Sequence, residues 1–168
     1  MKPPPKTLSA LAVPLDIEPM EAKLVEELPE GDWQYEPKWD GFRCLAFCLA
    51  DKVDLKAKSG KPLARYFPEM VAALKNLPAG SFVLDGELAI VSDGDFSFDA
   101  LLQRIHPSES RIKLLSTETP AIFILFDMLL DPSGKSLIEA PLSERRAALE
   151  KFFASAKQQR DLKLSPYT

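Results

Sequence analysis

The chain contains few of the residues and patterns that several classes of protein require. Its 168 residues include two cysteines and one histidine, too few for a zinc site with the usual four ligands. No run approaches the ~20 apolar residues that cross a membrane, and the first residues lack the apolar stretch of a signal peptide. We therefore expect a soluble intracellular protein of the cytoplasm, with no membrane contact.

The two cysteines, Cys44 and Cys48, are four residues apart in an apolar run. On a strand they would share one face, with their Cα atoms too far apart for a disulfide bond. We interpret them as buried free thiols, which fits a reducing compartment.

A positive net charge is also lacking. The chain has 21 Lys and Arg against 25 Asp and Glu, a net charge of −4. This excludes binding to nucleic acid through overall charge, although a local basic face is still allowed. The 46% apolar fraction and the length fit one globular domain with a sizeable core.

Hydrophobic patterns predict an α+β fold of mainly antiparallel sheets with packed helices. A proline-rich start, residues 1–18, predicts a mobile arm before a single domain at 19–168. Strands are expected at 42–49, 53–58, 82–91 and 121–130, with a turn near Ala50. Helices are expected at 19–28, near 67–77, after an N-cap at Ser97, and after an N-cap at Ser143.

A cluster of charges lies at the mouth of the first predicted strand, in EPKWDGFRCLAF at 36–47. Gly41 lacks a Cβ, so a ligand could approach the backbone closely. Lys38 could be a nucleophile if desolvation lowers its pKa, and Asp40 could orient it. Arg43 offers a fork of donors for a ribose or phosphate. The same spacing also fits a surface lysine, an aspartate in a turn and a solvated arginine.

Two further strands carry polar or aromatic residues. In FVLDGELAIV, Asp85 and Glu87 share one strand face, where they need a metal, a cation or a ribose hydroxyl, unless that face is open to solvent. In IFILFDML, Phe126 and Asp127 end the most apolar run of the chain. Phe126 could stack on a flat base, or it could belong to the core.

Taken together, these motifs resemble those of the covalent nucleotidyltransferases. KWDGFR with EP before it looks like their nucleophile motif, and FVLDGELAIV and FILFDML resemble two later motifs in order and spacing. The further stretches PM, LLQR and PLSERRAALE make the chain most similar to bacterial ATP-dependent DNA ligases of the double-strand break repair type. The fold implied is an ATP-grasp-like adenylation domain, incomplete at its C-terminus.

The resemblance implies that Lys38 attacks the α-phosphate of ATP and forms a lysine–AMP intermediate. AMP then passes to the 5′-phosphate of nicked DNA, and the 3′-hydroxyl displaces it. The cofactor set implied is ATP with Mg²⁺ or Mn²⁺, and the partners are nicked DNA and, in the intact system, a Ku-type end-binding protein. The matching ATP contacts are Glu36, Pro37, Arg43, Lys58, Glu87 and Phe126, with Glu87 also near the metal and with Asp40, Gly41 and Asp85 in support.

Two features depart from the family pattern. The motif that usually reads S-R-N-G is Ala57-Lys58-Ser59-Gly60 here, so lysine replaces an arginine fork. The chain also ends at LKLSPYT, before the family's last motifs and its OB-fold domain. We therefore expect weak or absent self-adenylation and no nick sealing by this chain alone. A capping-type RNA guanylyltransferase and a non-catalytic nucleotide-binding module are the alternatives.

Overall fold

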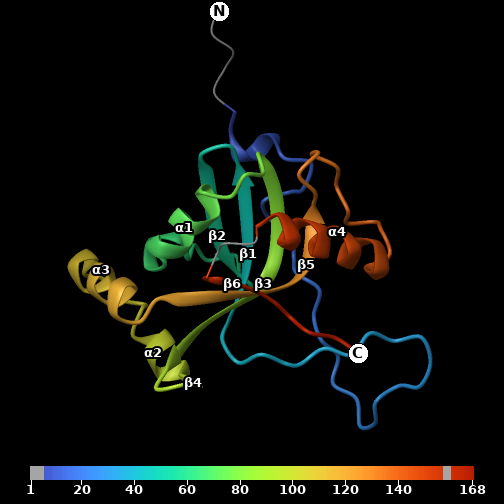
Figure 1. Ribbon diagram of the computed structural model, residues 1–168, viewed down its shortest axis with the longest axis horizontal. Coiled ribbons are helices and arrows are strands. Elements are labelled where there is room, and N and C mark those ends of the chain that lie inside the picture. The colour runs from blue at the N-terminus through green and yellow to red at the C-terminus, as the bar shows by residue number, and fades with distance from the viewer. Residues whose placement is uncertain (1–5, 157–159) are drawn as a thin grey trace, which may run out of the picture.

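The computed structural model describes residues 6–156 and 160–168, and its centre is one mixed sheet with the strand order β2-β1-β3-β5-β6 (Figure 1). All pairs along this path are antiparallel except β5–β6, which is parallel. The strands are β1 (Phe42–Leu49), β2 (Lys52–Ala57), β3 (Ser81–Ser92), β4 (Asp95–Phe96, paired only with β3), β5 (Ala121–Leu130) and β6 (Leu162–Leu164). The helices are η1 (Leu8–Ala10), η2 (Ala64–Tyr66), α1 (Pro68–Lys75), α2 (Phe98–Leu102), α3 (Glu109–Glu118) and α4 (Leu142–Ser155).

One face of the sheet carries the main hydrophobic core. Alternate residues of β1 and β3 point into it, and α1 and α4 cover it, with Met70 and Leu149 fully buried. Phe123 of β5 is also fully buried in this core and packs against Gly86 of β3. A Cβ at Gly86 would lie 2.6 Å from the Phe123 ring and 2.5 Å from the Ile124 carbonyl oxygen, which explains a glycine inside this strand.

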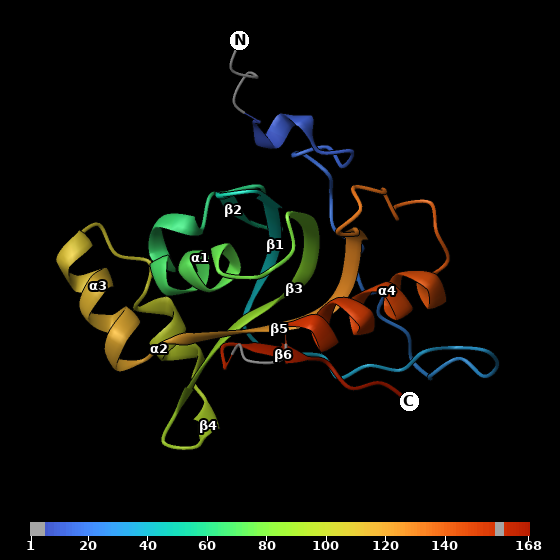
Figure 2. The same ribbon diagram turned by 45° about the horizontal axis from the view of Figure 1, so that its top comes forward.

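The other face of the sheet is covered over only part of its area. There the segment from Leu8 to Ile17 packs on a smaller apolar cluster that includes Val13 and Phe47, both essentially inaccessible to solvent. The segment predicted as an arm therefore lies against the sheet from residue 8 onward, and residues 1–5 lie outside the described residues. Figure 2 shows η1 beyond the end of the sheet. The division of the chain at residue 18 stays a prediction.

Two bulges in β5 turn extra side chains toward this partly covered face. Asp85 of β3 pairs with Asp127 and Gly86 pairs with Leu125, so Phe126 has no partner residue. A second register shift leaves Leu129 without a partner in the same way. At a bulge, two consecutive residues oppose one residue of the neighbouring strand and the alternation of side chains is broken. Phe126 therefore lies beside Arg43 on the side of Asp85, while the Asp127 carboxylate accepts a hydrogen bond from Arg145 of α4 at 2.9 Å.

Most predicted elements are confirmed with small changes in their ends. The hairpin from β1 to β2 turns at Ala50, whose φ is 54°, and Ser97 caps α2 by accepting a hydrogen bond from the Ala100 amide. The predicted Ser143 cap is wrong, because α4 begins at Leu142 after Pro141. Cys44 and Cys48 are buried free thiols, as predicted.

The helix predicted at 19–28 is absent, and this segment has no regular secondary structure. Its apolar side chains lie in solvent, with Leu24 97% exposed and Leu28 75% exposed. A short helix gains most of its stability from packing an apolar face, and this segment has no surface to pack on. Figure 1 shows it in blue as part of a long loop that projects from the sheet.

Among the described residues, we find no helix that is both long and apolar enough to span a membrane.

Candidate functional site

The candidate site lies at the start of β1, where the loop that carries Lys38 meets β3. Gly41 donates its backbone amide to Glu87 Oε1 at 3.1 Å. A Cβ at Gly41 would lie 2.1 Å from the carbonyl oxygen of Leu88, so only glycine allows the two backbones to approach this closely. Beside this contact is a hollow of about 380 Å³ that Lys38, Gly41 and Glu87 help to line. The glycine of the motif thus brings the lysine loop next to the carboxylate of Glu87.

Glu87 has an unusual environment for a carboxylate. It is half-buried in the middle of β3, directly across from Arg43 of β1. Burial raises the pKa of Glu87 to about 7, and the charge of Arg43, the Gly41 amide and the charge of Lys38 oppose that rise only in part. Near neutral pH this group can therefore carry or release a proton, or exchange the proton for a cation.

Arg43 is fixed by Asp85 and Phe126. Its Nε and Nη2 donate to the two carboxylate oxygens of Asp85, each at 2.6 Å, and its guanidinium lies 4.7 Å from the centre of the Phe126 ring. Burial lowers the pKa of Arg43, but the hydrogen bonds and charge of Asp85 outweigh burial and raise it. The pair is bidentate and the Asp85 side chain is 2% exposed, so the arginine is held as a charged, oriented donor.

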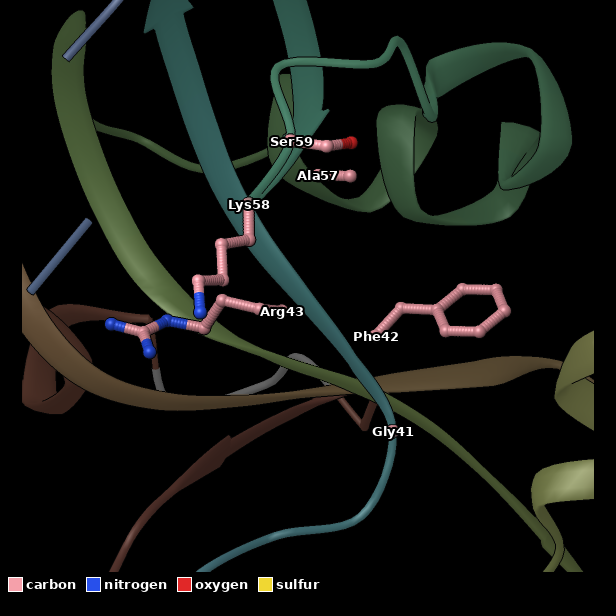
Figure 3. A pocket seen from close by; sticks show the side chains of 6 residues that line it. All are labelled: Gly41, Phe42, Arg43, Ala57, Lys58 and Ser59. Atoms are coloured by element: carbon pink, nitrogen blue, oxygen red, sulfur yellow. The ribbon is translucent and has the colours of Figure 1, made fainter. Parts of the chain in front are cut away.

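A second hollow, of about 430 Å³, opens between the start of β1 and the end of β2. Figure 3 shows Arg43 and Lys58 directed to the same side of β1, while Phe42 points to the other side. Lys58 Nζ lies 2.8 Å from Glu21 Oε1, and Arg43 Nη2 also donates to the carbonyl of Met20 at 3.0 Å. Two cations thus meet at one opening, and the segment at residues 20–21 contacts both of them.

The Lys38 amine is more exposed than the sequence-based interpretation requires. We expected desolvation of this side chain, and the structure shows it 85% exposed, with Asp40 Oδ1 as its ionic partner at 3.2 Å. The cause is local, because residues 34–40 form no strand or helix and Lys38 stands at the rim of its hollow. The contact between Asp40 and the Lys38 amine is the one that Asp40 would need in order to orient Lys38.

Three of the predicted ATP contacts, Glu36, Pro37 and Phe126, line neither hollow, although the Phe126 ring contacts Arg43. Glu36 is exposed and accepts a hydrogen bond from Gln34, and Pro37 is exposed next to it. The predicted residues that the structure brings together are Lys38, Asp40, Gly41, Arg43, Lys58, Asp85, Glu87 and Phe126, and it leaves Glu36 and Pro37 outside.

Sequence reasoning missed three residues at the site. Trp39 and Phe98 line the hollow beside Lys38, and the Met20 carbonyl binds Arg43. Trp39 is next to the lysine and could have been included on that ground. The positions of Phe98 and Met20 depend on tertiary contacts, and no sequence pattern reports them.

The described residues offer few ligands for a metal ion. Within residues 6–156 and 160–168, no group of three or more His, Cys, Asp or Glu side chains could hold one. Asp85 is engaged by Arg43, so Glu87 is the carboxylate of the site without an ionic partner of its own. Mg²⁺ is often held by one or two carboxylates together with substrate phosphates, and Glu87 fits that arrangement.

The fold and this arrangement of lysine, strand carboxylate and arginine define a nucleotidyltransferase-like site, and comparison with known proteins assigns the family. Residues 11–167 match the model of the ATP dependent DNA ligase domain, and the chain belongs to that family. The resemblance of the motifs to ATP-dependent DNA ligases is thereby confirmed.

Curated relatives narrow the assignment. The chain is 47% identical over 137 residues to DNA ligase C of Mycobacterium tuberculosis and 45% identical over 145 residues to DNA ligase C2 of Mycolicibacterium smegmatis. These matches cover 79% and 83% of the chain but 37% and 39% of the relatives. The chain thus spans about two fifths of their length.

Solved structures agree on the fold. The ligase domain of M. tuberculosis LigD superposes with a TM-score of 0.60 at 26% identity, covering 80% of the chain and 39% of that domain. A mycobacterial DNA ligase D solved in complex with ATP and MES gives a TM-score of 0.59 at 23% identity. The predicted α+β adenylation-domain fold is thereby confirmed for the part that is matched.

Proposed function

We propose that this chain carries the nucleotide-accepting part of an ATP-dependent DNA ligase, with Lys38 as the nucleophile. The observation that carries the proposal is the shared hollow of Lys38 and Glu87, next to the Arg43–Asp85 pair. The neutral amine of Lys38 attacks the α-phosphorus of ATP. A phosphorus–nitrogen bond forms, the bond to the β-phosphate oxygen breaks, pyrophosphate leaves, and the amine loses a proton.

The remaining site residues have distinct roles in this proposal. Arg43, held by Asp85, presents donors to the nucleotide, and the Phe126 ring offers a flat surface to the base. Lys58 supplies a second positive charge at the opening. Glu87 would hold Mg²⁺ or Mn²⁺, which would offset the charge that develops on the phosphates. Glu36 and Pro37 would reach the nucleotide only if the exposed loop moves toward the hollow.

The later steps concern DNA. AMP would pass from Lys38 to a 5′-phosphate at a nick, and the 3′-hydroxyl would then displace it. The chain covers about two fifths of its curated relatives, so we expect these steps to need regions beyond the match. One relative is named a multifunctional non-homologous end joining protein, LigD of Pseudomonas aeruginosa. We extend the proposal to double-strand break repair near the bacterial nucleoid, with a Ku-type protein as partner.

The test is incubation of the purified chain with labelled ATP and Mg²⁺, followed by mass spectrometry of the intact and digested protein. We expect one added AMP on Lys38 in a fraction of the molecules and none in Lys38→Ala. An adduct with GTP alone would replace the proposal with a capping-type guanylyltransferase. No adduct, together with equal ATP affinity in the parent and in Lys38→Ala, would favour a non-catalytic binding module.

A further inference from the structure

The segment around Lys38 lacks secondary structure, yet both of its ends are held by the same distant part of the chain. On one side, the Tyr35 amide donates to the Thr168 carbonyl at 2.9 Å, and the Thr168 amide donates back to Tyr35 at 3.0 Å. On the other side, the Trp39 indole Nε1 donates to Ser165 Oγ at 3.0 Å. Residues 36–38 therefore lie between two contacts with residues 165–168.

This distant part is itself fixed to the body of the domain. Ser165 is fully buried, and its amide donates to the Leu125 carbonyl of β5 at 2.8 Å. Arg146 of α4, 4% exposed, donates to the Ser165 carbonyl at 2.8 Å. The Arg146 guanidinium also lies 4.5 Å from the centre of the Tyr167 ring. A rigid helix and a rigid strand thus hold residues 165–168 in place.

Trp39 also packs edge-on against the Phe96 ring of β4, with 5.6 Å between the ring centres. The side-chain contacts of Glu36 and Lys38 are local. Glu36 binds Gln34 and Lys38 binds Asp40, both within two residues, so neither contact ties the segment to the sheet. The Gly41 amide reaches Glu87, but only at the end of the segment. The hydrogen bonds of Tyr35 and Trp39 to residues 165–168 are therefore the long-range hydrogen bonds that flank residues 36–38 on both sides.

We propose that residues 165–168 form a clasp that positions the Lys38 segment over its hollow, with Ser165 acting through Trp39 and with Arg146 anchoring the clasp. This proposal rests on the proposed function, because it takes Lys38 to be the nucleophile that the clasp positions. Small misplacements of a nucleophile cost large factors in rate, so loosening the clasp lowers the adenylation rate more than it lowers ATP affinity.

The first experiment tests the clasp itself and needs no activity. The chain has two tryptophans, so NMR of the indole N–H groups gives two signals, one from Trp39 and one from the exposed Trp33. In Ser165→Ala we expect the Trp39 signal to move and its solvent exchange to accelerate about two- to tenfold, the range of one lost hydrogen bond. The Trp33 signal stays unchanged. An unchanged Trp39 signal would overturn the proposal.

The second experiment tests positioning. At saturating ATP, we expect Ser165→Ala to add AMP to Lys38 about tenfold more slowly than the parent, with ATP affinity within twofold. Trp39→Phe, which keeps an aromatic ring but removes the donor, should lose a similar factor, and the double variant should lose no more than either single variant. Arg146→Lys, a milder change than truncation of a buried side chain, should give a smaller loss in the same direction.

The control variant is Ser116→Ala. The Ser116 hydroxyl donates to the Lys113 carbonyl within α3, away from the clasp. We expect it to match the parent in both experiments. A shifted Trp39 signal with a parental adenylation rate would overturn the proposed positioning, and so would equal losses of rate and ATP affinity. A parent that takes up no AMP would count against the proposed function instead, and the indole exchange would still decide whether the clasp exists.

Discussion

The two faces of the central sheet are built on different principles. The face under α1 and α4 is a continuous apolar core in which side chains such as Phe123 are fully buried. The opposite face has a smaller apolar cluster beneath residues 8–17 and, beyond it, carries Arg43, Asp85 and Glu87 beside Ile124 and Phe126. The first face fixes the strands, and the second carries the Arg43–Asp85 ion pair and the Glu87 carboxylate, which accepts a hydrogen bond from the Gly41 amide. The difference shows that stability and chemistry can be altered separately in this domain, and four changes test that separation.

The largest expected effect comes from a pair of phenylalanines in β5. Phe123→Ala should destabilise the fold by about 3–5 kcal/mol, because it opens a cavity in the main core. Phe126→Ala, on the site face of the same strand, should cost about 1 kcal/mol, mainly through its lost contact with Arg43. Urea denaturation followed by circular dichroism measures both. Equal losses would show that the two faces contribute alike.

Breaking the ion pair of the site face should have the next largest effect. Asp85→Asn leaves the largely buried Arg43 charge without its partner, and we expect a loss of about 2–3 kcal/mol in the free energy of unfolding. The double variant Arg43→Met with Asp85→Leu should be much more stable than Asp85→Asn, because two apolar side chains leave no buried charge without a partner. A double variant as unstable as Asp85→Asn would mean that the site face depends on the charges themselves.

Glu87 should make the stability depend on pH over a defined range. Its pKa of about 7 lies above the ordinary value of 4.5, so the folded state keeps a proton that the unfolded state releases between these two values. Stability therefore falls as pH rises from 4.5 to 7 and then levels off. Because the group is partly exposed, we expect a fall on the order of 1 kcal/mol. Denaturation curves of Glu87→Gln should lack this fall, and an identical fall in the variant would contradict the assignment.

The smallest effect is expected at the exposed pair of Lys58 and Glu21. Both side chains are more than half exposed, and water and salt screen such pairs, so this pair should contribute little to stability. A double-mutant cycle with Lys58→Ala and Glu21→Ala, measured at low and high salt, should give a small coupling energy that salt removes. A coupling near 2 kcal/mol would show that the rim of the opening is as firmly held as Arg43.

The sequence predicted those features that depend on local pattern. The strands, the turn at Ala50 and the Ser97 cap followed from periodicity and capping chemistry. The motifs predicted that Lys38, Arg43 and Glu87 would lie near one another, but they also predicted Glu36 and Pro37, which lie outside the hollows. Sequence patterns do not report whether a segment has a surface to pack on. Residues 19–28 have none, so the helix expected there does not form. The exposure of Lys38 and the bulge at Phe126 likewise depend on how distant strands meet.

The bulge at Phe126 limits how this strand can be altered by insertion or deletion. A one-residue deletion there would restore strict alternation and would either remove the aromatic ring from Arg43 or separate the carboxylate of Asp127 from Arg145. The extra residue therefore sets the register of β5 against β3, and its presence matters as much as its identity. Sequence comparisons across this region should accordingly treat a gap at this position as a change in the site, even where every flanking residue is retained.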